Sequence, residues 1–127
     1  MPVKMQADRI EGTNAISRHG PEGVVVNNVE YRSSLVVPWQ GRVISWHGTR
    51  FEDLTEEHFR TLAALAPELV VFGSGTRIRF PRPALLRPLI DARIGIETMD
   101  SPAACRTYNV LLAEGRSVVA ALLFDSP

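Results

Sequence analysis

Two glycines follow the first strongly apolar run of the chain. Gly73 and Gly75 come directly after residues 69–72, and Arg77 lies two residues further on. Glycine loops of this kind cradle phosphates when a third glycine or a Gly-Lys-Ser/Thr triplet follows. Ile78 stands where a dinucleotide-binding loop needs its third glycine, and the triplet is absent. We therefore expect a tight turn with close backbone approach and no nucleotide or other cofactor.

A second group of polar residues begins where the strand expected at residues 94–99 ends. Ligands of open α/β sheets gather at the carboxyl ends of strands, and a helix that starts there offers free N–H groups and the positive end of its dipole. Together with Arg77 or Arg79, the group predicts a binding site for a small anion or for a partner's carboxylate. Its members are Asp100, Ser101, Cys105, Arg106 and Asn109.

A structural alternative exists for the same residues. Asp100 or Ser101 can simply cap the helix, which is the commonest use of these residue types. Arg106 can pair with an internal acid, such as Asp100 or Glu97. The sequence leaves both interpretations open.

Nucleophilic and metal chemistry have weaker support. Cys105 lies where a helix dipole can lower a thiol pKa, but a nucleophile also needs a base within reach. The histidines, His19, His47 and His58, lie in the other half of the sequence and show no ligand spacing. We expect Cys105 to be a small core residue, and we predict neither a catalytic residue nor a metal site. An enzyme that uses Gly73, Asp100, Cys105 and Arg106 is the rival hypothesis.

A basic run, Arg77-Ile78-Arg79-Phe80-Pro81-Arg82, mixes cations with an aromatic side chain. Such a segment can contact RNA or an acidic partner, or it can be a solvated loop. Fourteen Lys and Arg residues balance fourteen Asp and Glu residues, so the formal net charge is zero. Generic nucleic-acid binders depend on a basic surface, so we expect no nucleic-acid partner. A neutral chain does not discourage a homo-oligomer.

Alternating strands and helices position these residues in the second half of the chain. Short apolar runs at residues 69–72 and 118–124 predict buried strands, and residues 94–99 are expected to form another strand. Strands separated by helices favour parallel pairing with right-handed crossovers. The last run is apolar throughout, which indicates a central strand.

Proline and glycine mark the helices between those strands. Pro83 suits the first turn of a helix that reaches residue 92, and Pro88 predicts that this helix is short, kinked or partly irregular. The next helix is expected to begin with Ser101 as its cap and to run to about Glu114. Gly115 follows and suits the end of the helix.

The first third of the chain predicts antiparallel hairpins. Asn27 and Asn28 tolerate positive φ and separate the β-rich runs 24–26 and 29–31, which predicts a two-residue turn. A second hairpin is expected to pair residues 34–37 with residues 42–46.

Two further elements complete the prediction. We expect a short strand near residues 10–16, after a flexible start at residues 1–9. A helix capped by Thr55 should end at Pro67.

Length and composition place the chain among small globular proteins. Its 127 residues, of which 45% are hydrophobic, suit a single domain of residues 1–127. We expect an α/β fold of three layers, a mixed sheet with helices packed on it and N-terminal antiparallel hairpins. One cysteine excludes an internal disulfide and favours a reducing, cytoplasmic location. Neither a signal peptide nor a transmembrane segment is expected.

Several segments resemble a widespread family of small α/β proteins. The similar segments are residues 23–27, 53–55, 71–75, 95–100 and 103–111. This family includes the mitochondrial respiratory complex I assembly factor 3 and the adipogenesis-associated Mth-type domain proteins.

The resemblance implies a compact mixed-sheet fold and no known enzymatic activity. The mitochondrial members help to assemble a membrane-bound respiratory complex together with a partner assembly factor. Because a transit peptide is not expected here, a bacterial-type relative is the closer match. The resemblance therefore predicts a non-enzymatic binding or assembly protein with a protein partner, whereas a small-molecule-binding or anion-binding protein or enzyme is the alternative.

Overall fold

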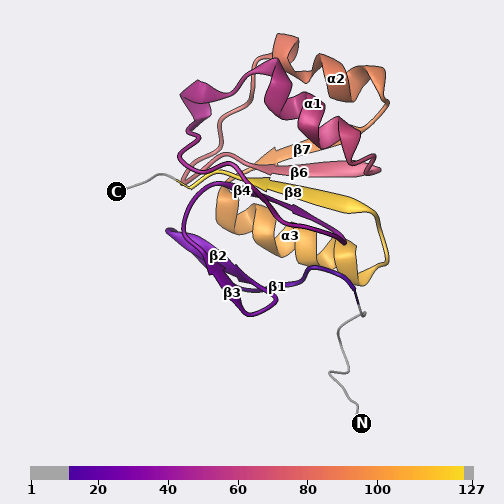
Figure 1. Ribbon diagram of the computed structural model, residues 1–127. Coiled ribbons are helices and arrows are strands. Elements are labelled where there is room, and N and C mark those ends of the chain that lie inside the picture. The colour runs from indigo at the N-terminus through magenta and orange to yellow at the C-terminus, as the bar shows by residue number, and fades with distance from the viewer. Residues whose placement is uncertain (1–11, 125–127) are drawn as a thin grey trace.

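The structure is a computed structural model that describes residues 12–124 (Figure 1). Within these residues it contains two β-sheets, three α-helices and two short 3-10 helices. The predicted α/β class is confirmed. The expectation of a flexible start at residues 1–9 lies outside the described residues.

A five-stranded mixed sheet forms the middle layer. β8 pairs antiparallel with β4 and parallel with β6, and β6 pairs parallel with β7. The predicted parallel pairing and the central place of the last strand are therefore confirmed. The strand order is β5 (Ile44–Ser45), β4 (Leu35–Pro38), β8 (Val118–Leu122), β6 (Leu69–Gly73) and β7 (Gly95–Met99).

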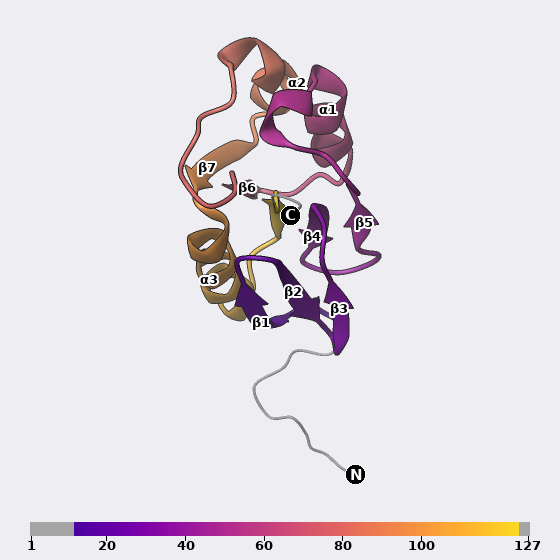
Figure 2. The same ribbon diagram turned by 90° about the vertical axis from the view of Figure 1, so that its left-hand side faces the viewer.

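Both faces of this sheet are covered. α1 (Glu56–Ala64) and α2 (Arg87–Asp91) pack on one face, whereas α3 (Ser101–Ala113) and the smaller sheet pack on the other (Figures 1 and 2). Successive side chains of β8 alternate between the two cores, because strand residues point to opposite faces in turn. This is why the run needs apolar residues throughout, and it confirms the predicted three layers.

The smaller sheet consists of β1 (Ile16–Gly20), β2 (Gly23–Val26) and β3 (Val29–Tyr31). Asn27 and Asn28 adopt φ of 50° and 69°, which confirms the predicted two-residue turn.

The strand expected near residues 10–16 is wrong in position. Before Ile16, the described chain makes one isolated bridge, from Thr13 to Gln40, and the strand extends forward to Gly20 instead. The error arose because three exposed residues, Ser17 to His19, give β1 little apolar alternation.

The helices begin and end close to the residues that the prolines and capping residues predict. α1 ends before Pro67, and the proline-rich segment forms a 3-10 helix, η2 (Pro83–Leu86), followed by the five residues of α2, as the prolines predict. The cap of α3 is Asp100 rather than Ser101, because Asp100 Oδ1 accepts a hydrogen bond from Ala103 N at 2.8 Å. Both types cap helices well, so the sequence could not choose between them.

Candidate functional site

Ser101 joins three segments at the carboxyl ends of the parallel strands. Its Oγ accepts a hydrogen bond from Gly75 N at 2.9 Å and donates one to Leu123 O at 2.7 Å. The side chain is buried, so the hydroxyl satisfies two backbone groups that would otherwise lack partners. Ser101 therefore fastens the glycine loop and the end of β8 to the start of α3.

Ser74 has a similar role within the glycine loop. It is fully buried, and its Oγ donates to Arg77 O at 2.7 Å and accepts from Arg79 N at 2.9 Å. Its own N–H donates to Met99 O at 2.9 Å, at the end of the neighbouring strand. Sequence reasoning missed this residue, because a serine between two glycines looks like any turn residue.

The two glycines are required for different reasons. A Cβ at Gly73 would lie 2.8 Å from Ser101 Cα and 3.0 Å from Ala104 Cβ, so only glycine allows this approach between β6 and α3. Gly75 adopts a φ of 106°, in the region that favours glycine. The predicted turn with close backbone approach is confirmed.

The first backbone N–H groups of α3 are already engaged. Ser101 N donates to Gly75 O at 2.8 Å, and Pro102 has no N–H. Ala103 N donates to the Asp100 side chain, and Ala104 N donates to Asp100 O. The positive end of the dipole is present here, but these four positions supply no free donor to an anion.

Asn109 binds the protein's own backbone. Its Nδ2 donates to Ile16 O at 2.7 Å and its Oδ1 accepts from Ile16 N at 3.1 Å. The amide thus serves as a strand partner for Ile16 beside the register shift in β1. It ties α3 to the smaller sheet.

Cys105 is fully buried in the core between the sheet and α3. Burial raises the pKa of its thiol to about 12, and the nearby Arg106 charge, which acts in the opposite direction, does not offset this. A thiol of this kind stays protonated at neutral pH and is a poor nucleophile. The prediction that Cys105 is a core residue is confirmed.

The arginines of the predicted site differ in their partners. Arg77 and Arg106 are exposed and have no ion-pair partner among residues 12–124. Arg79 instead reaches Glu52 at 3.1 Å and stacks 4.5 Å from the Phe51 ring centre. The alternative pairing of Arg106 with an internal acid is therefore not observed in the described part of the chain.

A small pocket of about 210 Å³ opens beside these residues. Gly75 and Ser101 line it, together with the turn between β1 and β2 and the residues that follow β8. No charged side chain lines it, so its walls suit an apolar group better than an ion. The other lining residues are Gly20, Pro21, Thr76, Pro102, Leu123 and Phe124.

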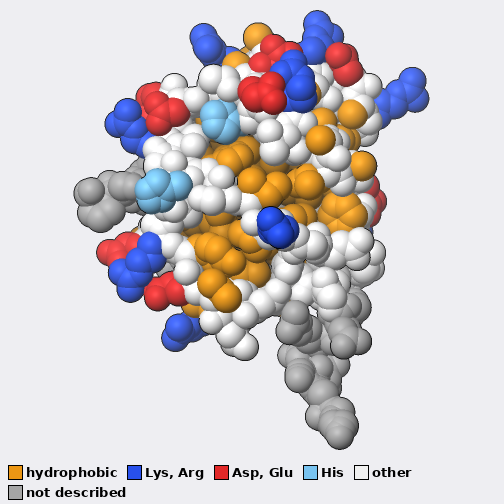
Figure 3. Space-filling view, in the orientation of Figure 1, with side chains coloured by type: hydrophobic (Ala, Val, Ile, Leu, Met, Phe, Trp, Pro, Cys, Tyr) orange, Lys and Arg blue, Asp and Glu red, His pale blue; other side chains and the backbone are white. Residues whose placement is uncertain are grey.

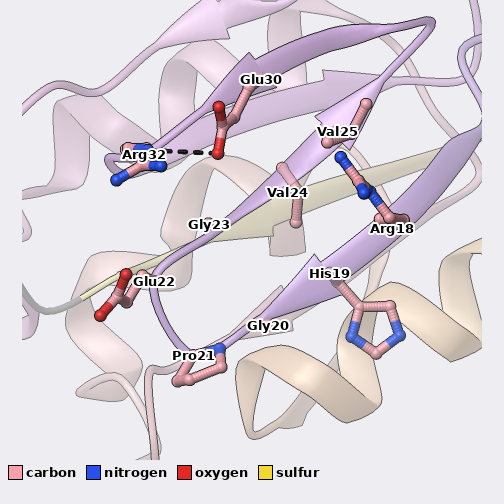
Figure 4. Close-up of a pocket in the computed structure, with 10 residues that line it drawn as sticks. All are labelled: Arg18, His19, Gly20, Pro21, Glu22, Gly23, Val24, Val25, Glu30 and Arg32. Atoms are coloured by element: carbon pink, nitrogen blue, oxygen red, sulfur yellow. Dashed lines mark hydrogen bonds and ion pairs between the residues drawn. The ribbon is translucent and has the colours of Figure 1, made fainter.

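A larger and shallower hollow of about 340 Å³ lies over the hairpin of β1 and β2 (Figure 4). Its charged residues are Arg18, Glu22, Glu30 and Arg32, and His19 lies at the end of β1. Glu30 and Arg32 form an ion pair of 3.1 Å. Two cations balance two carboxylates, which gives the hollow no preference for an anion.

The described part of the chain contains neither a candidate metal site nor a candidate membrane-spanning helix. Residues 12–124 contain no group of three metal-ligating side chains. None of the helices described here has the length and apolar character needed to span a bilayer.

Comparison with known proteins identifies relatives. The bovine (Bos taurus) NADH dehydrogenase [ubiquinone] 1 alpha subcomplex assembly factor 3 is 36% identical over 111 residues, which cover 85% of this chain and 59% of that protein. The chain therefore spans less than two thirds of that relative's length.

Solved structures agree with the fold. A crystal structure of a protein from Bordetella parapertussis has a TM-score of 0.84 at 38% identity, and the match covers 92% of this chain and all of that one. A solution structure of an Mth938-like domain from Bordetella pertussis has a TM-score of 0.82 at 32% identity, covering 98% of this chain and 95% of that one.

A family model described as a protein of unknown function (DUF498/DUF598) matches residues 16–123. This match and the relatives above confirm the resemblance drawn from the sequence, and the chain belongs to the DUF498/DUF598 family.

Proposed function

We propose that the chain is a non-enzymatic binding protein that acts in the manner of an assembly factor. The observation that supports this most is the 36% identity, over 85% of the chain, to a protein named as an assembly factor of NADH dehydrogenase. An assembly factor works by holding a protein partner, so the proposal requires an interaction surface.

Apolar side chains on the surface support this proposal. They gather in the middle of the face drawn in Figure 3, between α1 and the three-stranded sheet, with one cation among them. The half-buried side chains of Trp39, Val43 and Ile44 belong to the hairpin of β4 and β5. Contiguous exposed apolar surface is typical of interaction sites.

The residues that the sequence singled out divide into two groups. Arg77 and Arg106 keep exposed guanidinium groups, and we propose them for contact with a partner's carboxylates. The others have structural partners or core positions: Gly73, Gly75, Asp100, Ser101, Cys105 and Asn109.

Affinity capture from cells of the native host tests the proposal. The tagged chain should enrich at least one specific protein, and the purified pair should co-elute in size-exclusion chromatography. Arg106→Ala serves as the paired variant, because its fold should be unchanged. If no protein is enriched over an unrelated tagged domain of similar size, the assembly-factor hypothesis fails.

A small-molecule-binding function is the second candidate. It is supported by the 210 Å³ pocket at the carboxyl ends of β6 and β8, where ligands of α/β sheets gather. Adding a library of small apolar fragments to ¹⁵N-labelled protein tests it directly. Saturable shifts of the Gly75 and Ser101 amides would support this function, and unchanged amides would argue against it.

We also propose a cytoplasmic location. A single, fully buried cysteine fits a reducing compartment, where no disulfide is needed. Fractionation of the native host with an antibody against the chain would test this.

A further inference from the structure

Positive charge is concentrated in one segment of this neutral chain. Residues 69–90 contain no Asp or Glu and four arginines, namely Arg77, Arg79, Arg82 and Arg87. Arg79 pairs with Glu52, and Arg87 lies 3.7 Å from Asp91. Arg77 and Arg82 have no ion-pair partner among the described residues. Two cations are thus available for a partner.

The Phe80 loop, defined as residues 74–82, carries these two arginines, and several contacts tie the loop to the rest of the protein. Figure 2 shows the loop as an arch on the outside of the molecule, between β6 and η2. The buried Ser74 hydroxyl bonds two of its backbone groups. Further along, the Arg79 side chain is clamped by Glu52 and Phe51, and Pro81 is buried.

The same loop presents apolar side chains to solvent. Phe80 is 73% exposed and Ile78 is 52% exposed. They flank Arg79, whose side chain contacts Glu52 and Phe51, while both apolar side chains are exposed to solvent. Single exposed apolar residues are ordinary, but here an aromatic ring is held out on a fixed loop between two unpaired cations.

The contact of Arg79 with Glu52 and Phe51 leaves one hydrogen-bond donor of Arg79 without a partner in the described part of the chain. Arg79 Nε is buried and has no hydrogen-bond partner among the described residues. Desolvating a donor without a partner opposes folding, so stability alone does not explain the position of this loop. Departures of this kind are expected where a surface serves binding.

We propose that the Phe80 loop docks a protein partner whose surface has an apolar socket for Phe80 and Ile78, flanked by carboxylates that pair with Arg77 and Arg82. The inference rests on the proposed binding function and adds to it a docking surface distinct from the apolar side chains of the β4–β5 hairpin, with its partner chemistry. A preorganised aromatic beside arginines has the composition of an interface hot spot. Two apolar side chains and two cations give a membrane only a weak hold, which favours a protein.

Photo-cross-linking tests the location of the docking surface. p-Benzoyl-L-phenylalanine replaces Phe80 in the full chain and, as controls, Val29 on β3 and Val110 on α3, which are 51% and 58% exposed. We expect one host protein to cross-link at position 80 and not at the controls. Sequencing should place the link in an apolar segment with neighbouring Asp or Glu residues. A link in a segment without carboxylates overturns the inference.

The purified cross-linked protein then serves as the probe for affinity. Phe80→Ala should weaken its binding at least about tenfold, the loss expected of a hot spot, whereas Val110→Ala should leave it unchanged. Arg77→Glu with Arg82→Glu should also weaken binding, and Lys at the partner's linked carboxylate should restore part of it. Unchanged binding by Phe80→Ala overturns the inference.

The remaining outcomes separate the two proposals. A partner that links at position 29 or 110 instead supports the binding function and overturns the Phe80 loop as its surface. Sedimentation with phosphatidylglycerol vesicles that depends on Phe80 replaces the protein partner with a membrane. If the wild-type chain captures nothing, the proposed function fails together with this inference.

Discussion

Replacing Gly73 with alanine tests how closely β6 and α3 approach each other. The added Cβ would lie 2.8 Å from Ser101 Cα, 2.9 Å from its Oγ and 3.0 Å from Ala104 Cβ. A backbone atom cannot rotate away, so the start of α3 must shift. Overpacking of this kind costs about 1–3 kcal/mol, and the two Ser101 hydrogen bonds contribute about 1 kcal/mol each. We expect Gly73→Ala to lower the free energy of unfolding by about 2–4 kcal/mol.

Gly95→Ala is the matched control, because it also adds one methyl group to a strand glycine without positive φ. Its Cβ would meet only Leu69 Cδ1, at 3.3 Å, which is the end of a flexible side chain. We expect its effect to stay within about 0.5 kcal/mol. Urea unfolding followed by circular dichroism measures both variants. A Gly73→Ala variant as stable as wild type, or equal losses at the two positions, would refute the close-approach argument.

Four further predictions concern α3. Thiol reagents should label the buried Cys105 slowly in the native protein and rapidly in denaturant, and fast native labelling would contradict its burial. The pKa of Cys105 is raised to about 12 in the folded protein, whereas the unfolded thiol ionises at about 8.5. The free energy of unfolding should therefore fall as the pH rises above about 8.5. Thermal melts between pH 8 and 10 should show a smaller decrease of Tm with pH for Cys105→Ala than for the wild type. Asn109→Ala removes both hydrogen bonds between the side-chain amide and the backbone of Ile16. It should lower the free energy of unfolding by about 1–3 kcal/mol, so an unchanged Tm would show that these hydrogen bonds are dispensable. Arg106→Ala should leave the Tm within the range of a surface substitution, and a large drop would reveal a structural role for its exposed side chain.

Most of the fold could be predicted from short sequence patterns, because turns, helix ends and buried strands depend on residues that are close together in the sequence. Asn27 and Asn28 tolerate the positive φ that the turn requires, and Pro88 cannot occupy the interior of a long helix. The apolar run from residue 118 matches a strand buried on both faces. β1 was misplaced because its exposed residues lack such a pattern.

The roles of the polar residues could not be predicted in the same way. The sequence places Ser101 and Asn109 in one helix, but it does not show whether a polar side chain meets a ligand, water or the protein's own backbone. Asn109 bonds a residue 93 positions away, and Ser101 bonds Leu123, 22 positions away. Such partners depend on the register of packed elements, which a single sequence does not reveal.

The central place of β8 has a consequence for synthesis on the ribosome. β4 and β6 are both complete long before β8, yet neither pairs with the other, because β8 lies between them and bonds both. A nascent chain that stops short of Val118 therefore exposes two apolar strand edges at once, which are prone to aggregation. The five-stranded sheet therefore cannot be completed before β8 has been synthesised, and until then the strands on either side of it lack their shared neighbour.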